Sequence, residues 1–160
     1  MKNFVTTFLL ACIGTSVLGQ NTTNFAHIGR IDRFEPEVNE LIPKDAKIEV
    51  LCGGFEWSEG PVWMPESENK YGGFVLFSDI PNNVVMKWQE GVGASVYMKP
   101  AGYTGVADYG REPGSNGLAL DAKGRLVMCE HGDRRISVVT TGGGKITLAD
   151  RWICLLYTSD

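Results

Sequence analysis

The stretch that decides the fold runs from residue 74 to residue 98 and reads FVLFSDIPNNVVMKWQEGVGASVYM. It holds three short runs of β-branched, aromatic and other apolar residues, at 74–80, 84–88 and 94–98, separated by Pro-Asn-Asn and by glycines. Runs of this kind with turn residues between them are typical of antiparallel strands joined by tight turns. A fourth apolar run at 60–64 completes a unit of four expected strands.

A second unit of the same design follows, with strands expected at 118–120, 125–129, 136–140 and 146–149. Glu59 falls opposite Ser115, 56 residues later, and the other three strands repeat after about 51 or 52 residues. Four short strands repeated about every 50 residues are typical of β-propeller blades. One blade cannot bury both of its faces, so neighbouring blades must cover it. A β-sandwich is the alternative fold, but the near-constant offset favours the all-β propeller.

Composition excludes several classes of protein. The chain has 160 residues, a net charge of −4 and 43% hydrophobic residues, which suits a globular protein. No basic patch favours nucleic-acid binding, and no segment after the N-terminus predicts a membrane span. Cys52 and Cys129 are expected to be buried free thiols, although a disulfide between them stays open.

The N-terminus predicts an exported protein, either periplasmic or secreted. Lys2, an apolar run at 4–13 and Val17-Leu18-Gly19 indicate a signal peptide over residues 1–19. A lipoprotein signal, with Cys12 as the anchored residue, is the alternative. Residues 20–45 are expected to form an N-terminal arm, because Pro36 and Pro43 argue against a long helix in this segment.

Residues 46–152 are expected to be the first part of a propeller domain. Propellers have about four to eight blades, and this range has room for about two. Residues 153–160 have no counterpart in the repeat, and CLLYTSD resembles translated adapter sequence. We therefore expect a non-native tail after an N-terminal fragment of a longer protein, with a native apolar strand as the alternative.

Several motifs in order carry a resemblance to a known family. The first is Glu59-Gly60-Pro61-Val62-Trp63, followed by stretches at 77–83, 99–105, 111–118 and 121–132. Over residues 28–152 the chain resembles the family of gluconolactonase, senescence marker protein and luciferin-regenerating enzyme, and within it the gluconolactonase branch. The resemblance implies a six-bladed propeller with a divalent cation, usually Ca²⁺, in its central tunnel.

The resemblance also implies two ligands for that cation, Glu59 and Asn116, and makes Asn116 a substrate contact as well. Carboxylate and amide oxygens are the ligands that Ca²⁺ prefers, and both residues stand at the head of the first strand of their unit. The alternatives are a solvated turn carboxylate for Glu59 and a turn residue for Asn116. The family's later Asn ligand and its Asp, the implied general base, have no counterpart in this sequence.

Other residues are weaker candidates for the site. His131 could act as acid or base or bind substrate, but a ring bonded to nearby backbone is the simpler expectation. Glu130 could contact sugar hydroxyls, and Arg111 could reach a substrate from its loop unless it is only a solvated charge. Asp79 is expected to cap the turn at Pro81.

The resemblance implies an enzyme that hydrolyses a sugar lactone, with the cation polarising the lactone carbonyl. Its small-molecule partner would be the lactone, and the 160-residue chain alone is expected to be inactive. A non-catalytic propeller that binds a sugar or a protein partner is the alternative, because fold alone does not determine function.

Overall fold

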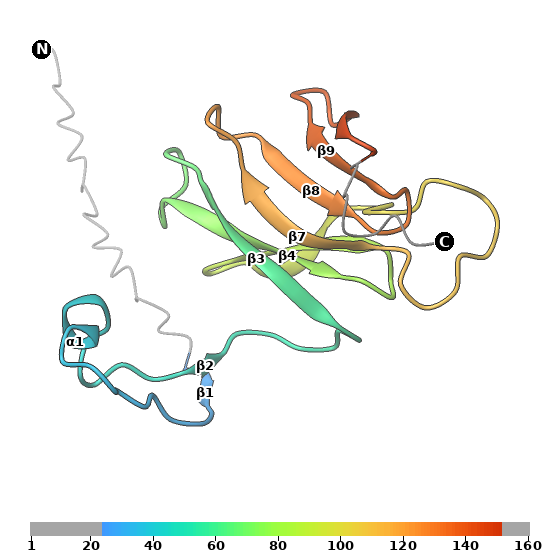
Figure 1. Ribbon diagram of the computed structural model, residues 1–160. Helices are drawn as coiled ribbons and strands as arrows, with labels where there is room; N and C mark the ends of the chain where they lie inside the picture. The colour runs from blue at the N-terminus through green and yellow to red at the C-terminus, as the bar shows by residue number, and fades with distance from the viewer. Residues whose placement is uncertain (1–23, 152–160) are drawn as a thin grey trace, which may run out of the picture.

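The structure, a computed structural model, describes residues 24–151 (Figure 1). The expected signal peptide, the Cys12 anchor and the tail at 153–160 lie outside these residues and stay predictions. The segment before the two sheets, residues 24–57, extends past the expected boundary at residue 45 and is called the arm from here on. Within it, strands β1 (Ala26–His27) and β2 (Glu49–Val50) pair antiparallel, and helix α1 (Val38–Leu41) lies between them in the sequence. No helix in the described range is long and apolar enough to span a bilayer.

Two four-stranded antiparallel sheets follow the arm, and each keeps its strands in chain order. The first consists of β3 (Ser58–Pro65), β4 (Gly73–Asp79), β5 (Val84–Gln89) and β6 (Gly93–Met98). The second consists of β7 (Ser115–Leu120), β8 (Leu126–Glu130), β9 (Arg135–Val139) and β10 (Lys145–Ala149). The eight strands predicted for the two units are confirmed, although β3 and β7 begin two or three residues earlier than predicted. The apolar run at 47–51 is strand only at β2 and joins neither sheet.

The two sheets repeat their irregularities as well as their strands. The register of β3 shifts between Glu59 and Val62, and that of β7 shifts between Ser115 and Leu118. The turn before the third strand ends on a residue with positive φ in both sheets, Asn83 at 54° and Arg134 at 53°. A shared bulge and a shared turn at matching positions confirm the structural repeat that the offset predicted.

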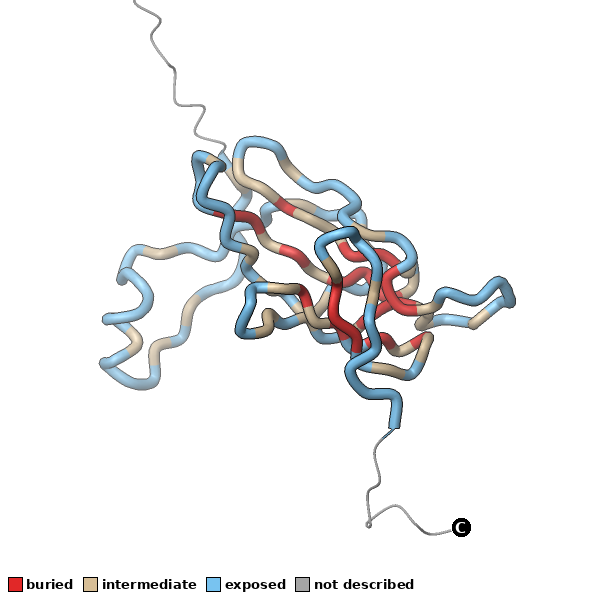
Figure 2. The backbone as a smooth tube through the Cα atoms, turned by 90° about the horizontal axis from the view of Figure 1, so that it is seen from above, coloured by how far each residue is buried: buried red, intermediate tan, exposed pale blue. Residues whose placement is uncertain are grey.

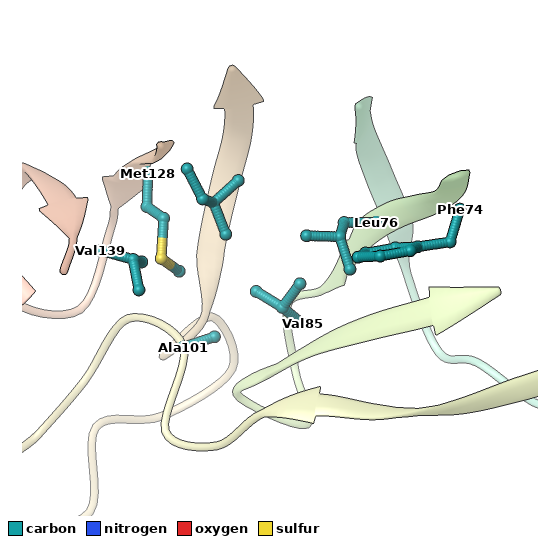
Figure 3. Packing of buried hydrophobic residues seen from close by; sticks show 7 residues of the cluster. Phe74, Leu76, Val85, Ala101, Met128 and Val139 are labelled. Atoms are coloured by element: carbon teal, nitrogen blue, oxygen red, sulfur yellow. The ribbon is translucent and has the colours of Figure 1, made fainter. Parts of the chain in front are cut away.

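A single apolar core lies between the two sheets. Leu76 and Val85 of the first sheet are fully buried and belong to one apolar cluster with Leu126 and Met128 of the second. Leu76 and Val85 lie on one side of this cluster and Met128 on the other (Figure 3). Buried residues gather where the sheets meet, while the periphery is exposed (Figure 2). Burying each side chain of this size contributes about 1.5–3 kcal/mol. This packing also sets β3 beside β7, which positions the first strands of both units together.

The outer faces of the two sheets differ. Phe25 and Phe55 of the arm pack edge-on against Trp88 and Phe77 of the first sheet, with ring centroids 6.2 and 4.9 Å apart. On the second sheet Ile146 is 53% exposed. The arm therefore covers part of the outer face of the first sheet.

The two described cysteines are free thiols in different surroundings. Cys52, in the arm, is half-buried, and this burial raises the pKa of its thiol. The expectation of a buried thiol is wrong for Cys129, which is exposed. Met128 points into the core, so the alternation of a strand turns Cys129 to the open outer face.

Candidate functional site

Glu59 and Asn116 are each the second residue of the first strand of their sheet. Because β3 and β7 pack together, the two residues come to the same end of neighbouring strands. A Cβ atom on Gly60 would lie 2.5 Å from the Asn116 carbonyl oxygen. The backbone next to Glu59 thus touches the backbone of Asn116.

Ser78 of β4 connects these two positions. It pairs with Glu59 in the strand ladder. Its hydroxyl donates to the Asn116 carbonyl oxygen at 2.9 Å and lies 2.9 Å from the Ser115 hydroxyl. Ser78 and Ser115 are fully buried. Their hydroxyls therefore form a buried hydrogen-bonded link between the residue paired with Glu59 and the backbone of Asn116.

The side-chain oxygen Oδ1 of Asn116 is buried and has no hydrogen-bond partner among the described residues. An unpaired buried acceptor costs about 1–3 kcal/mol, and in native proteins it calls for a bound water, an ion or strain. An amide oxygen of this kind is a ligand that hard cations accept. The orphaned oxygen therefore fits a divalent cation.

Glu59 adds a carboxylate to this end of the interface. It is partly exposed, and it lines a pocket of about 340 Å³ together with Ser58, Pro61, Phe55, Phe77 and the arm residues Ile28, Glu49, Val50, Leu51 and Cys52. Residues 24–151 hold no group of three or more His, Cys, Asp or Glu side chains that could bind a metal. Glu59 and Asn116 therefore offer one carboxylate and one amide oxygen at neighbouring strand ends, although Asn116 does not line the pocket that contains Glu59.

His131 follows β8 at the same end of the second sheet, where its N–H donates to the Gly114 carbonyl at 3.3 Å. Its ring Nδ1 lies 2.8 Å from the Glu112 carbonyl oxygen, and its edge packs on Tyr109 with centroids 6.0 Å apart. A carbonyl only accepts, so Nδ1 donates to it, and a Glu112 carboxylate oxygen lies 3.6 Å from the same nitrogen. The ring is held by nearby backbone, which was the simpler expectation.

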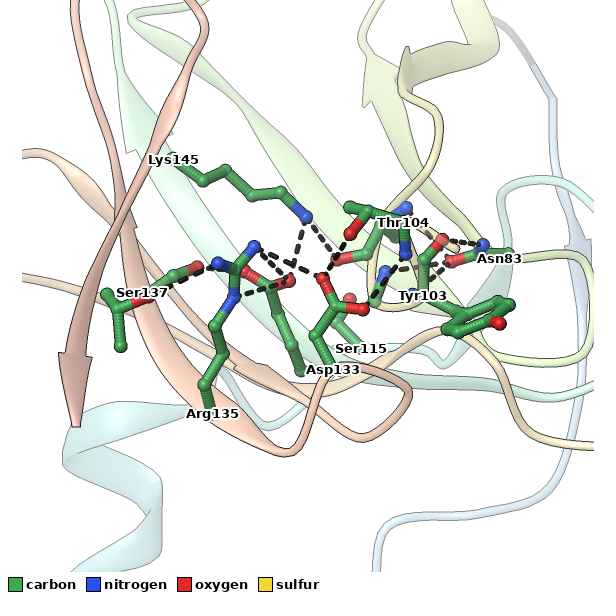
Figure 4. A network of polar contacts seen from close by, with 12 residues as sticks. Asn83, Tyr103, Thr104, Ser115, Asp133, Arg135, Ser137 and Lys145 are labelled. Atoms are coloured by element: carbon green, nitrogen blue, oxygen red, sulfur yellow. Dashed lines mark hydrogen bonds and ion pairs between the residues drawn. The ribbon is translucent and has the colours of Figure 1, made fainter. Parts of the chain in front are cut away.

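Glu130 is buried inside the second sheet, whereas the sequence made it a candidate for contact with sugar hydroxyls. It is 2% exposed, and its carboxylate accepts from Arg135 at 3.1 Å, from Lys145 at 2.9 Å and from the Ser137 hydroxyl (Figure 4). Strand alternation turns it to the same inner face as Met128. With both oxygens engaged inside the protein, Glu130 has a structural role, and its proposed contact with sugar hydroxyls has no support here.

Arg111 and Asp79 complete the predicted set. Arg111 is exposed in the loop between the sheets, which is the solvated alternative. Asp79 caps its turn as predicted, because Oδ2 accepts from the Asn82 side chain at 2.8 Å. It also accepts the backbone N–H groups of Glu56 and Trp57 at 3.2 and 3.1 Å. The sequence offered no signal for these two bonds, because they join segments more than twenty residues apart.

Comparison with known proteins agrees with this geometry, although no protein-family model matches the chain. A gluconolactonase of Zymomonas mobilis subsp. mobilis is 37% identical to it over 128 residues, or 79% of the chain. Two solved structures are also similar. One, assigned to the gluconolactonases by its family, is 31% identical with a TM-score of 0.57 over 74% of the chain. The other, a gluconolactonase of Xanthomonas campestris, is 25% identical with a TM-score of 0.56 over 82% of the chain.

The chain belongs to the gluconolactonase family. It spans 35% of the Zymomonas gluconolactonase and 36% and 37% of the two solved chains. The two four-stranded sheets are neighbouring blades of the β-propeller, and the motif at 59–63 forms the first strand of the first blade. Glu59 and Asn116 therefore stand on the first strands of neighbouring propeller blades.

Proposed function

We propose that this chain supplies part of the active site of an enzyme that hydrolyses a sugar lactone with a bound divalent cation, Ca²⁺. The observation that carries the proposal is the buried, unpartnered Oδ1 of Asn116 on the strand beside Glu59. The relatives that are gluconolactonases support the reaction, and the oxygen chemistry of the two side chains supports the ion.

In this proposal Glu59 holds the cation with its carboxylate and Asn116 with its amide oxygen. A bound divalent cation polarises an ester carbonyl and lowers the pKa of bound water. Hydrolysis adds the hydroxide part of water to the acyl carbon and breaks the bond from that carbon to the ring oxygen. The ring oxygen takes up a proton, and the product is an open-chain hydroxy acid.

His131 would bind the substrate in this scheme. Its Nδ1 is fixed by the Glu112 carbonyl, which leaves Nε2 to form a hydrogen bond with a sugar hydroxyl at the rim of the site. The described residues offer no general base with comparable support, so we assign that role to none of them.

The test uses the protein encoded by the complete reading frame that contains this chain. Hydrolysis of glucono-δ-lactone is followed by titration of the released acid, with and without a calcium chelator. We expect chelation to abolish turnover and Ca²⁺ to restore it. Glu59→Gln should lower kcat/KM by about 10²-fold or more, as the loss of a group that stabilises the transition state does, whereas the exposed carboxylate variant Glu68→Gln should match the wild type.

Two results would count against the proposal. Full turnover in chelator would remove the cation from the reaction. Absence of turnover on every aldonolactone tried, with sugar binding retained, would favour a propeller that only binds its ligand.

A further inference from the structure

We propose that the end of β4 and the residue after it, Ser78-Asp79-Ile80, is the element that sets the position of Glu59 relative to Asn116. Asp79 and Ser78 are then positioning residues for the two cation ligands. The inference rests on the proposed function, and it assigns roles to residues that do not themselves reach the cation.

The Asp79 carboxylate holds the backbone that leads into Glu59. Asp79 is 3% exposed. Its Oδ1 accepts the N–H groups of Glu56 and Trp57 at 3.2 and 3.1 Å, and its Oδ2 accepts from Asn82 at 2.8 Å. Three donors on one buried carboxylate fix its orientation, so Trp57, two residues before Glu59, cannot shift without breaking charge-assisted hydrogen bonds.

Ile80 connects that same backbone to the second blade. Its N–H donates to the Trp57 carbonyl at 3.2 Å, and its own carbonyl accepts the Gly114 N–H at 3.0 Å. Gly114 lies two residues before Asn116, just as Trp57 lies two residues before Glu59. A Cβ atom at Gly114 would lie 2.6 Å from the Ile80 oxygen, so the approach requires glycine.

Ser78 contacts the backbone of the two proposed ligands themselves. It stands opposite Glu59 in the ladder and donates to the Asn116 carbonyl oxygen. Three consecutive residues therefore contact the backbone before and beside both ligands. If these contacts only packed the blades together, a change at Asp79 would loosen the backbone around Glu59 and leave the backbone around Asn116 unchanged. A measurement on both strands distinguishes the two cases.

The experiment compares Asp79→Asn and Ser78→Ala with a matched control, Asp121→Asn, in the protein of the complete reading frame. Asp121 accepts the backbone N–H groups of Lys123 and Arg125 at 2.8 and 2.9 Å. It therefore makes similar hydrogen bonds, but at the end of the second blade away from Asn116. Affinity for the Ca²⁺ analogue Tb³⁺ is measured by its luminescence, which Trp57 can sensitise. Amide hydrogen exchange is measured over residues 55–60 and 112–118.

We expect the Asp79 and Ser78 variants to bind Tb³⁺ about 10–100-fold more weakly, the usual effect of removing a group that orients a ligand. The control should bind like the wild type even where its midpoint of urea unfolding falls equally. Asp79→Asn should also speed exchange in both segments, although its carboxylate touches only the first.

Wild-type Tb³⁺ affinity in the Asp79 and Ser78 variants would overturn the inference. So would faster exchange confined to 55–60, or an equal rise in both segments in the control. If the wild type itself binds neither Tb³⁺ nor Ca²⁺, the cation in the proposed function fails. The exchange data then decide alone whether Ser78-Asp79-Ile80 couples the two strands.

Discussion

Replacing Gly60 by alanine should separate the two blades at the candidate site. Gly60 has φ +61°, a left-handed conformation, and its missing Cβ atom would meet backbone of β7. The distances would be 2.5 Å to the Asn116 oxygen and 3.1 Å to both the Gly117 Cα and the Leu118 nitrogen. Backbone in a packed strand cannot rotate away as the end of a side chain can, so β7 must move as a unit.

The expected loss has two parts. Holding alanine in the left-handed region costs about 1–2 kcal/mol, and overpacking a tight interface costs about 1–3 kcal/mol more. Gly124→Ala is the matched control, because Gly124 has φ +74° but open space around its missing Cβ. Alanine also restricts the unfolded chain equally at both positions, so that effect cancels in the comparison.

Urea unfolding followed by tryptophan fluorescence gives the free energy of unfolding of each variant. We expect Gly60→Ala to lose about 1–3 kcal/mol more than Gly124→Ala, the part that overpacking contributes. Equal losses in the two variants would refute the close approach of β3 and β7 and, with it, the neighbouring placement of Glu59 and Asn116.

Two further predictions concern the polar network of the second blade. Lys145→Met removes the ammonium group 2.9 Å from buried Glu130 and should lower the free energy of unfolding by about 1.5–3 kcal/mol. The control Lys123→Met, at an exposed lysine, should change this free energy little. Equal effects of the two substitutions would show that the buried ion pair contributes nothing. Burial acts to raise the pKa of Asp133, but the hydrogen bonds from Thr104 and the charges of Arg135 and Lys145 together outweigh it, and the pKa is lowered. The Asp133 carboxylate thus stabilises the fold fully above its unfolded pKa of about 3.9, and this contribution is lost as the pH falls through the lower folded value. Asp133→Asn should therefore flatten the acid side of a plot of unfolding free energy against pH, and parallel curves for the two proteins would contradict this.

Much of the fold could be predicted because its signals are local. Strand alternation, the turn at 81–83 and the glycine-rich turns act over a few residues, and their recurrence after about 51 residues indicated two blades. The motif at 59–63 and the Asn-Gly at 116–117 are local signals too, but only the family resemblance made Glu59 and Asn116 candidate ligands. Their neighbouring backbone positions follow from one rule, that equivalent strands of adjacent blades pack side by side.

What only the tertiary structure decided is which face of each strand meets the other blade. That choice turns Glu130 inward to Arg135 and Lys145, turns Cys129 outward, and gives the Asp79 carboxylate partners more than twenty residues away. A strand presents two faces with the same local pattern, and only contact with another element distinguishes them. The sequence therefore indicated Glu59 and Asn116 as candidate ligands through its family resemblance, while the packing of the two blades decided which backbone contacts fix their strands.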